Sequence, residues 1–304
     1  MKVLILGNSN IFQRKIYFAL KKFKNIEIEV ASKRKIDKNL KIKKNYFSYN
    51  EAINNTEAKL VYISLINSKH CYWALKSLKN NKHVIVDKPL ALNFEQSNKL
   101  LKLAIKKKLL LSEAIVFQYH DQFKKILSRI NVEKTTIISS KFHIPRLKKK
   151  NFRNYKRYGG GCFQDMSAYA AYLIYIFIKN KKYSLKKNLI NKNGCSESFD
   201  LTIKSKNIFL NSKFSFNSKY ENNIIITNKS KKYFINFAFS PPIYKSLDVM
   251  VFDQMKKRRY KIHFKKQNTF YTYFDKIFNV IKKKNYNFFY KEIKELAKIK
   301  KKIS

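Results

Sequence analysis

A lysine and an acidic residue end a short apolar run in the first third of the chain. Residues 83–87 read His-Val-Ile-Val-Asp and are followed by Lys88 and Pro89. Such a run is typical of a buried parallel strand, and ligands of parallel sheets collect beyond the carboxyl ends of the strands. Pro89 favours an extended backbone at Lys88, which would present the ammonium group from a stiff support. The position therefore suggests a chemical role for Lys88, although a solvated lysine is the simpler interpretation in a chain this rich in lysine.

A second group of residues with chemical potential follows a glycine run. Three of the five glycines of the chain stand together at residues 159–161, and Asp165 and Tyr169 come next on an apolar segment. Residues four apart lie on one face of a helix, so this carboxylate and this phenol would face the same way. A buried structural pair is the simpler alternative.

Residues 1–118 alternate between strand and helix patterns. The segments that read as strands are residues 3–6, 26–31, 60–65, 83–86 and 109–117. The segments with helical spacing of apolar residues are 16–23, 70–78 and 93–104. Strands alternating with helices imply a parallel sheet with right-handed crossovers. We therefore expect an α/β, doubly wound dinucleotide-binding (Rossmann) domain over residues 1–118.

The turn after the first strand has the form of a degraded phosphate-binding loop. Where the dinucleotide fingerprint has three glycines, this chain has Gly7, Ser9 and Phe12. Gly7 allows the tight turn, and Ser9 is small enough for backbone amides to approach a pyrophosphate. One degenerate match is weak evidence, but the strand, turn, helix and strand around it are the opening of a dinucleotide-binding unit.

The residues after the second strand bear on the choice of cofactor. An NAD site would place an acidic residue against the ribose hydroxyl, whereas this chain reads Ser32-Lys33-Arg34. A hydroxyl and two cations suit a 2′-phosphate, so NADP(H) is favoured, with NAD(H) as the alternative. A solvated basic run is the simpler interpretation here too.

From residue 119 onward the pattern changes. Short segments with frequent alternation occur at residues 199–210, 212–216, 223–227, 232–239 and 247–252. They are typical of an antiparallel sheet joined by hairpins. Helical spacing returns at residues 270–281, and a basic helix closes the chain. We expect a C-terminal α+β domain with a large, mostly antiparallel sheet over residues 119–304, for substrate binding and oligomerisation.

The net charge says little about partners. It is +48, from 67 Lys and Arg against 19 Asp and Glu, and would by itself suit nucleic acid. The lysines are spread over the whole chain, however, and Asn, Ile, Phe and Tyr are also abundant, a bias that an AT-rich genome would produce. We expect no specific nucleic-acid partner, while the positive field favours an anionic substrate.

The cysteines and histidines lack ligand spacing. Cys71, Cys162 and Cys195 form no C-x-x-C pattern and the five histidines are scattered, so we expect reduced thiols, a cytoplasmic protein and no metal. The N-terminal apolar run is too short for a signal peptide. The longest later run, residues 169–178, is about half of the ~20 residues that a membrane span needs, so no membrane association is expected.

Taken together, these motifs resemble the Gfo/Idh/MocA oxidoreductase family over nearly the whole chain. The matches, in chain order, are Gly7, Asn67, His70, the Asp87-Lys88-Pro89 form of the E/D-K-P motif, His120-Asp121-Gln122 near an HPQ-like motif, Arg153, and the run from Gly159 to Asp165 and Tyr169. The chain departs from the family at Ser9, Phe12 and Ser167, which replace glycines, and at Tyr169, where many members have histidine. The tyrosine form is similar to the branch with glucose-fructose oxidoreductase, dimeric dihydrodiol dehydrogenase and nucleotide-sugar ketoreductases, which mostly prefer NADP.

The resemblance implies an NAD(P)-dependent oxidoreductase. Hydride would pass between a nicotinamide and a secondary carbinol or ketone of a sugar, nucleotide sugar or related polyol. Tyr169 would move the proton on the substrate oxygen, Lys88 would stabilise the oxyanion or phenolate, and Asp165 would hold Lys88 or a substrate hydroxyl. A homodimer or homotetramer is expected.

The expected binding residues form two sets. Those for cofactor are Gly7, Asn8, Ser9, Asn10, Ile11, Ser32, Lys33, Arg34, Ser64, Asn67, His70, Asp87 and Lys88. Those for substrate are His120, Arg153, Asp165 and Tyr169.

Two other functions compete with this one. A relative that binds cofactor but acts as a sensor or scaffold would explain the altered loop. A basic nucleic-acid-binding protein would explain the charge, but would give Lys88, Asp165 and Tyr169 no role.

Overall fold

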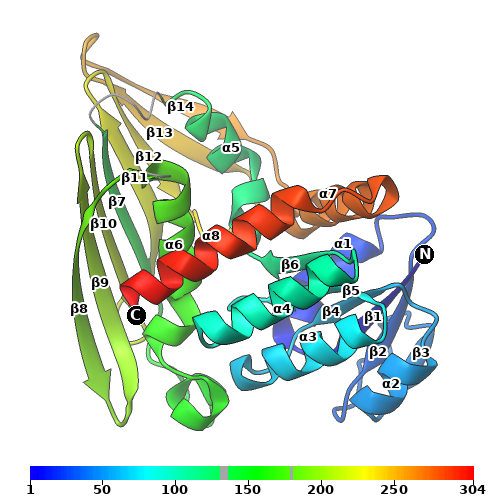
Figure 1. Cartoon of the computed structure of the whole chain (residues 1–304). Coiled ribbons are helices and arrows are strands. Elements are labelled where there is room, and N and C mark those ends of the chain that lie inside the picture. Colours follow the sequence, from blue (N-terminus) through cyan, green and yellow to red (C-terminus); the bar gives the residue numbers. More distant parts are fainter. Residues whose placement is uncertain (131–135, 179–180) are drawn as a thin grey trace. The chain divides into compact units, whose positions relative to one another are not determined.

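The chain folds into two compact units. The computed structural model describes residues 1–130, 136–178 and 181–304 (Figure 1). Unit 1 comprises Met1–Ile115 and Phe270–Lys301, and unit 2 comprises Val116–Thr269 and Lys302–Ser304. Residues 270–301 thus lie in the N-terminal unit, whereas the sequence pattern placed them in a domain running from residue 119 to the C-terminus.

Unit 1 is built on a parallel sheet of six strands in the order β3-β2-β1-β4-β5-β6. The strands are β1 (Lys2–Leu6), β2 (Glu27–Ala31), β3 (Lys44–Tyr46), β4 (Leu60–Ile63), β5 (His83–Asp87) and β6 (Leu111–Ala114). This is the doubly wound dinucleotide-binding order. The chain adds β2 and β3 on one side of β1 and then adds β4, β5 and β6 on the other side, so the strand order reverses between β1 and β4. The predicted Rossmann fold is confirmed, although β3 was not foreseen and the strand expected at 109–117 ends at Ala114.

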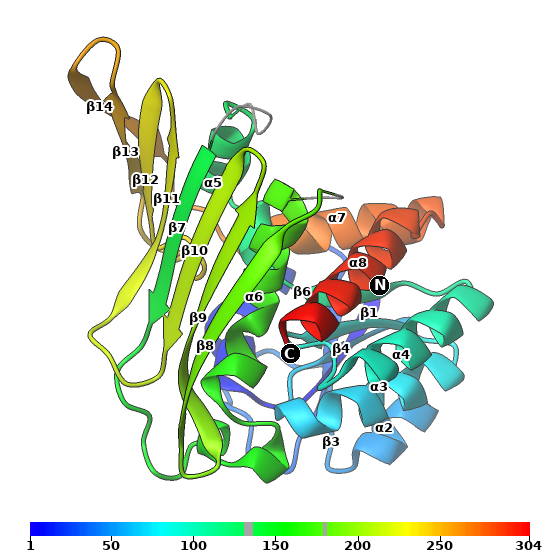
Figure 2. The ribbon, with the colours of Figure 1, turned by 60° about the vertical axis from the view of Figure 1, so that its left-hand side comes forward.

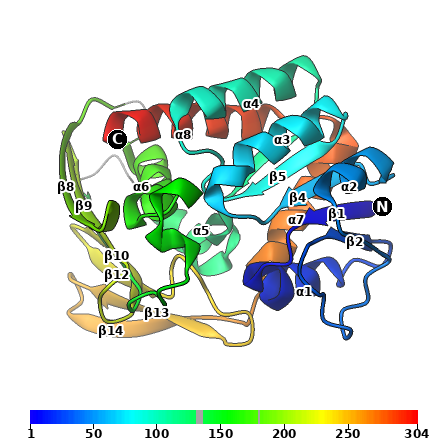
Figure 3. The same cartoon turned by 90° about the horizontal axis from the view of Figure 1, so that it is seen from below.

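Helices cover both faces of this sheet. They are α1 (Tyr17–Leu20), preceded by the π-helical segment η1 (Phe12–Ile16), then α2 (Tyr49–Asn55), η2 (Asn67–Lys69), α3 (His70–Lys79), α4 (Phe94–Lys106), α7 (Thr269–Lys283) and α8 (Asn287–Ile303). In Figure 3, α3 and α4 lie on one face, α1 and α7 lie on the other, and α8 runs beside α4. Asn93 caps α4 by accepting the Gln96 amide at 2.9 Å, while the Gln96 side chain accepts the Leu92 amide at 3.1 Å. This reciprocal cap fixes where α4 begins.

The two C-terminal helices are bound to unit 1 by polar contacts as well as by their apolar faces. Lys300 contacts both carboxylate oxygens of the buried Glu113 at 2.6 and 2.8 Å. The hydroxyl groups of Tyr273 and Ser112 lie 2.7 Å apart, and Tyr290 donates to the Leu109 carbonyl at 2.8 Å. Helical spacing in a sequence shows which face is apolar but not what that face packs against, which is why this return was missed.

Unit 2 is an α+β fold with an eight-stranded sheet in the order β14-β13-β12-β11-β7-β10-β9-β8. The strands are β7 (Thr136–His143), β8 (Ser184–Lys192), β9 (Cys195–Ser205), β10 (Ile208–Ser215), β11 (Glu221–Asn228), β12 (Lys231–Asn236), β13 (Leu247–Asp253) and β14 (Arg258–Phe264). All neighbouring pairs are antiparallel except β7 and β10. The expected large, mostly antiparallel sheet is therefore confirmed.

The helical part of unit 2 lies mainly on one face of this sheet. Its elements are η3 (Val116–Tyr119), α5 (Asp121–Leu127), η4 (Phe152–Asn154), η5 (Lys156–Tyr158) and α6 (Cys162–Ile178). Figure 2 shows α6 lying along the sheet, where it packs on β9 and β10. The strands meet it with alternate residues, as in β7 with its Ile138, Ser140 and Phe142 buried.

In unit 2 one strand segment was assigned wrongly from the sequence, and two strands were missed. The single segment expected at residues 199–210 is two strands, β9 and β10, joined by a tight turn at Lys206 and Asn207. β8 and β14 were not predicted. The turn between β9 and β10 contains no glycine, and the two missed strands are edge strands rich in lysine or arginine, so the usual turn and strand signals are weak there.

The scarcity of glycine also leaves ordinary residues in left-handed backbone, and this gives a testable consequence for stability. Lys108 follows α4 with φ of 52°, where the amide of Leu109 bonds to the carbonyl of Ala104 at 2.9 Å. This helix ending normally has glycine, because a Cβ is strained there. Lys108→Gly is expected to raise the free energy of unfolding by about 1 kcal/mol in a denaturant titration.

Lys107→Gly is the matched control. Lys107 has φ of −90°, so glycine there relieves no strain and is expected to lower stability. A Lys108→Gly protein no more stable than the parent would contradict the assignment of strain.

In residues 1–130, 136–178 and 181–304, no helix is long and apolar enough to cross a bilayer.

Candidate functional site

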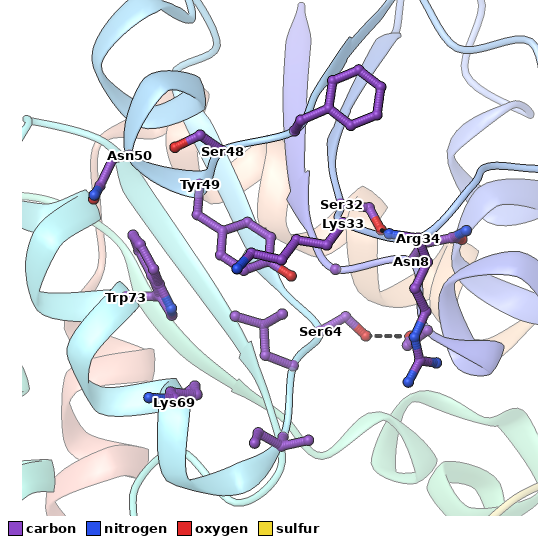
Figure 4. Close-up of a pocket in the computed structure, with 15 residues that line it drawn as sticks. Asn8, Ser32, Lys33, Arg34, Ser48, Tyr49, Asn50, Ser64, Lys69 and Trp73 are labelled. Carbon is purple, nitrogen blue, oxygen red and sulfur yellow. Dashed lines mark hydrogen bonds between the residues drawn. The ribbon is translucent and has the colours of Figure 1, made fainter.

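An open pocket of about 760 Å³ lies beyond the carboxyl ends of β1, β2 and β4 in unit 1 (Figure 4). Its lining residues are Gly7, Asn8, Ser9, Ser32, Lys33, Arg34, Phe47, Ser48, Tyr49, Asn50, Ser64, Leu65, Ile66, Lys69 and Trp73. The pocket sits where the strand order reverses, which is the ligand site of open α/β sheets. The structure brings together three turns that the sequence assigned to the cofactor, which carry Gly7 to Ser9, Ser32 to Arg34 and Ser64, and adds a fourth at residues 47–50.

Gly7 is required by both its backbone and its surroundings. Its φ is +104°, and a Cβ at this position would lie 2.3 Å from the carbonyl oxygen of Ser64. Its amide donates to the Ala31 carbonyl at 2.9 Å. The turn therefore lies directly against the ends of β2 and β4, which leaves the start of the following helix facing the pocket.

The other two fingerprint positions are filled in different ways. Phe12 is fully buried and its ring packs edge-on against Tyr17 at 6.3 Å, so the third glycine is replaced by a core aromatic. Ser9 accepts the Phe12 amide at 3.1 Å through its hydroxyl, which caps the first turn. The Asn8 side chain donates to the Lys35 carbonyl at 2.9 Å and accepts from Gln13 at 2.8 Å. The loop is thus ordered by side chains rather than by glycine.

The pocket is basic. Its lining contains Lys33, Arg34 and Lys69 and, among the residues described, no carboxylate. Ser32 is buried and its hydroxyl accepts the Arg34 amide at 2.9 Å, a local turn that leaves Lys33 and Arg34 exposed at the pocket. The donors at this rim fit a phosphate, because cations and a hydroxyl bind phosphate oxygens by charge-assisted hydrogen bonds.

The far side of the pocket is aromatic. Phe47, Tyr49 and Trp73 line it, and the Tyr49 and Trp73 rings meet edge-on at 5.1 Å. Figure 4 shows the Lys33 side chain extending across the Tyr49 ring toward Trp73. The sequence interpretation missed these aromatics and Lys69. The sequence from Ser48 to Glu51 fits a capping box, and Ser48 does cap α2 by accepting the Glu51 amide at 3.4 Å. Without β3, however, nothing in the sequence indicated that the first residues of α2 return to the pocket.

Several predicted cofactor residues do not line this pocket. Asn10 and Ile11 lie in the helix start next to it. Asn67 is buried at the start of η2, and His70 is fully buried with its ring nitrogens 2.7 Å from the Pro89 carbonyl and 3.0 Å from the Leu65 carbonyl. His70 therefore connects the turn after β4 to the turn after β5.

Asp87 and Lys88 lie at the end of β5. Asp87 accepts hydrogen bonds from Tyr62 and Ser64, each at 2.5 Å. Burial raises the pKa of Asp87, while these hydrogen bonds and the nearby charges of His70 and Lys88 act in the opposite direction. Lys88 is half-buried and its peptide bond to Pro89 is cis. The Lys-Pro motif is thus held by neighbouring turns of unit 1.

In unit 2 the glycine run positions Arg153 and Asp165. The Gly161 amide donates to the Arg153 carbonyl at 2.7 Å, and a Cβ on Gly160 would lie 2.5 Å from that same oxygen. The run therefore folds tightly on the Arg153 turn. As a result the Arg153 Nε lies 3.1 Å from Oδ1 of Asp165, whose side chain is 3% exposed. Arg153 was not foreseen as a partner of Asp165.

Tyr169 lies one turn further along α6 and enters an aromatic cluster. Its ring centroid is 5.9 Å from Phe117, 5.5 Å from Phe142 and 5.2 Å from Phe239. The residue is half-buried and shares the face of Asp165, as the spacing predicted. Unit 2 thus presents a carboxylate held by arginine beside a phenol set among aromatic rings.

His120 was expected to bind substrate, but the structure places it in the interior of unit 2. It is 1% exposed at the start of α5, where Nδ1 accepts the Gln122 amide at 3.2 Å. Burial lowers the pKa of His120 to about 4, so the ring is neutral near pH 7. This geometry gives the side chain a capping role.

In the part of the chain that the structure describes, no three His, Cys, Asp or Glu side chains are grouped to hold a metal ion. Cys71, Cys162 and Cys195 are all described and none is joined in a disulfide.

The fold and pocket of unit 1 define a dinucleotide-binding domain, and comparison with known proteins gives its family. Residues 1–115 match the GFO_IDH_MocA model, described as an oxidoreductase family with an NAD-binding Rossmann fold. The resemblance to this family that the motifs indicated is thus confirmed over residues 1–115.

Two curated proteins are similar to part of the chain. An uncharacterized oxidoreductase, ORF334 of Rhizobium meliloti, is 26% identical over 54% of this chain and 52% of its own length. The dTDP-3,4-didehydro-2,6-dideoxy-alpha-D-glucose 3-reductase of Saccharopolyspora spinosa is 29% identical over 40% of this chain and 38% of its own length. The chain thus spans about half, or less, of the length of these relatives.

Among solved structures, the 3-ketoreductase KijD10 of Actinomadura kijaniata, crystallised with NADP and TDP-benzene, has a TM-score of 0.89. It is 18% identical, with 98% of this chain and 94% of KijD10 covered. An aldose-aldose oxidoreductase of Caulobacter crescentus, crystallised with glycerol, has a TM-score of 0.84 at 13% identity, with 100% of this chain and 96% of that chain covered. At these identities the likeness shows the fold.

Proposed function

We propose that this protein is an NADP(H)-dependent oxidoreductase that transfers hydride between the nicotinamide and a secondary carbinol or ketone of a nucleotide sugar. The observation that carries the proposal is the basic pocket at the strand-order reversal of a dinucleotide-binding domain. Ser32, Lys33 and Arg34 stand there where an NAD site would have a carboxylate.

The lining fits the parts of NADP in order. The turn from Gly7 to Ser9 and the helix start behind it suit the pyrophosphate, because amides at a helix N-terminus bind anions. Lys33 and Arg34 suit the 2′-phosphate. The aromatic side formed by Tyr49 and Trp73 suits the adenine ring. When bound, the nicotinamide would supply or accept the hydride.

The chemistry assigned to the chain's own residues is proton transfer and charge stabilisation. Tyr169 would give or take the proton on the substrate oxygen. An ordinary phenol, with a pKa of ~10, is a poor base near neutral pH and needs a cation to stabilise its phenolate. Lys88 is the proposed cation, acting on the phenolate or on the substrate oxyanion. Arg153 would fix the Asp165 carboxylate so that it can accept a substrate hydroxyl.

A nucleotide sugar is favoured as the substrate for two reasons. The matched relative from Saccharopolyspora spinosa is named for a dTDP-sugar ketone, and KijD10 was crystallised with TDP-benzene. The chain itself is strongly basic, which would raise the local concentration of a diphosphate.

The proposal can be tested through the single tryptophan. Trp73 is the only tryptophan of the chain and lines the pocket, so NADPH is expected to quench its fluorescence saturably. Under the same conditions, a panel of keto and hydroxy nucleotide sugars is screened by the absorbance of the nicotinamide. We expect turnover with at least one of them.

The two measurements separate the competing functions. Absence of NADPH binding would refute the cofactor assignment. Tight binding without turnover on any substrate would instead favour the sensor or scaffold.

A further inference from the structure

A continuous chain of hydrogen bonds runs from the phosphate loop to the end of β5. The Ser9 and Ser64 hydroxyl oxygens lie 2.6 Å apart, and Ser64 donates to Oδ2 of Asp87 at 2.5 Å. Tyr62 donates to the other carboxylate oxygen of Asp87 at 2.5 Å. At the opposite end, Ser9 accepts the Phe12 amide at 3.1 Å. Three turns of unit 1 are therefore joined through side chains.

The directions of these bonds follow from what each group can do. An ionised carboxylate only accepts, so Tyr62 and Ser64 must both donate to Asp87. Ser64 has then used its hydrogen and accepts from Ser9. Ser9 in turn has lone pairs left for the Phe12 amide. Each hydroxyl in the chain has one defined direction, and this restricts the rotamer of Ser9 and the position of the loop.

A glycine at position 9 would lack the hydroxyl contacts with Ser64 and with the Phe12 amide. The first amides of a helix have no intrahelical partner. Ser9 satisfies the amide of Phe12 and its backbone carbonyl accepts the amide of Gln13 at 3.1 Å. The amides of Asn10 and Ile11 come before them in the same helix start, next to the pocket. The bond to Ser64 then holds this helix start against the sheet.

We propose that Ser9, held by Ser64 and Asp87, is a positioning residue for the pyrophosphate of the dinucleotide. The hydrogen bonds that link Ser9, Ser64 and Asp87 would then take the place of the missing fingerprint glycine. The inference rests on the proposed function, because it takes a dinucleotide as the ligand. It predicts the opposite of what the fingerprint suggests: restoring the glycine should impair binding.

The test compares two ligands by calorimetry. NADPH carries the pyrophosphate, whereas adenosine 2′-monophosphate has only the part expected at Ser32 to Arg34. Ser9→Gly and Ser9→Ala are expected to raise the Kd of NADPH ~10-fold through the lost hydrogen bonds. The Kd of adenosine 2′-monophosphate should change by no more than about twofold. Ser9→Thr keeps the hydroxyl and should retain most of the affinity for NADPH.

A double-mutant cycle checks that Ser9 acts through Ser64. The Ser9→Ala/Ser64→Ala protein is expected to lose little more NADPH affinity than Ser9→Ala alone, because both changes break one chain. Additive losses of NADPH affinity would mean that Ser9 and Ser64 act separately, and would overturn the proposal that Ser9 acts through Ser64.

The remaining outcomes are decisive as well. Ser9→Gly binding NADPH as tightly as the parent, or more tightly, would show that Ser9 merely stands in for glycine. Equal weakening of both ligands would mean a general structural role and would also overturn the proposal. If the parent protein binds adenosine 2′-monophosphate and all Ser9 variants bind NADPH with the affinity of the parent, the positioning role of Ser9 is refuted while the proposed function stands. A parent that binds neither ligand would refute the proposed function with it.

Discussion

Lys88→Ala is expected to lower kcat by ~10³-fold while the Kd of NADPH changes by no more than about twofold. Lys88 lies directly after β5 and does not line the pocket assigned to the dinucleotide. Its ammonium group would act on charge that develops in the transition state, and loss of such a group lowers kcat rather than ground-state binding. The measurement is steady-state kinetics together with calorimetric titration of NADPH.

Lys82→Ala provides the matched control. Lys82 precedes the same strand at its opposite end, where its ammonium group donates to the Thr56 carbonyl at 2.8 Å. It should leave kcat unchanged. Similar rates for the Lys88→Ala and parent proteins would refute the assignment of Lys88. A loss of NADPH binding equal to the loss of kcat would instead assign Lys88 to the cofactor.

The double variant Lys33→Ala/Arg34→Ala is expected to raise the Kd of NADPH by ~100-fold and to change that of NADH little. Two charge-assisted contacts to a 2′-phosphate would account for about 3 kcal/mol, and NADH lacks that phosphate. Both side chains line the pocket beyond β2, where no described carboxylate is available to bind a ribose hydroxyl. Fluorescence of Trp73 reports both titrations.

The neighbouring lysine serves as the control for this variant. Lys35 follows in the same basic run but does not line the pocket, and its contact with Asn8 is made by its backbone carbonyl, which Lys35→Ala retains. That variant should bind NADPH as the parent does. Equal losses of affinity for NADPH and NADH in the double variant would mean that the two cations contribute only a general positive field. The predicted preference for NADP would then be refuted.

Much of the fold could be predicted from local patterns. The buried runs that became β1, β4 and β5 are short, apolar and bounded by turns, and their alternation with helices fixes a parallel sheet. Once the sheet is parallel, residues that follow its strands must meet at one edge. Gly7, Ser32 and Ser64 therefore reach one pocket, and this could be inferred without coordinates.

The family resemblance was equally a property of the sequence. The Asp87-Lys88-Pro89 motif and the spacing from Gly159 to Tyr169 are both linear signals. The first lies within residues 1–115, which match the oxidoreductase family model, and the second lies outside the matched residues. The roles given to Lys88, Asp165 and Tyr169 remain predictions.

The tertiary structure alone decided which side chains meet. Residues 270–301 return to unit 1, where Lys300 neutralises the buried Glu113. Arg153 pairs with Asp165 because the glycine run folds back on its carbonyl. Ser9 reaches Asp87 through Ser64. A sequence shows which residues are apolar and where the chain can turn, because those properties depend on near neighbours. Contacts between residues tens or hundreds of positions apart depend on sheet order and packing, and only the folded chain defines them.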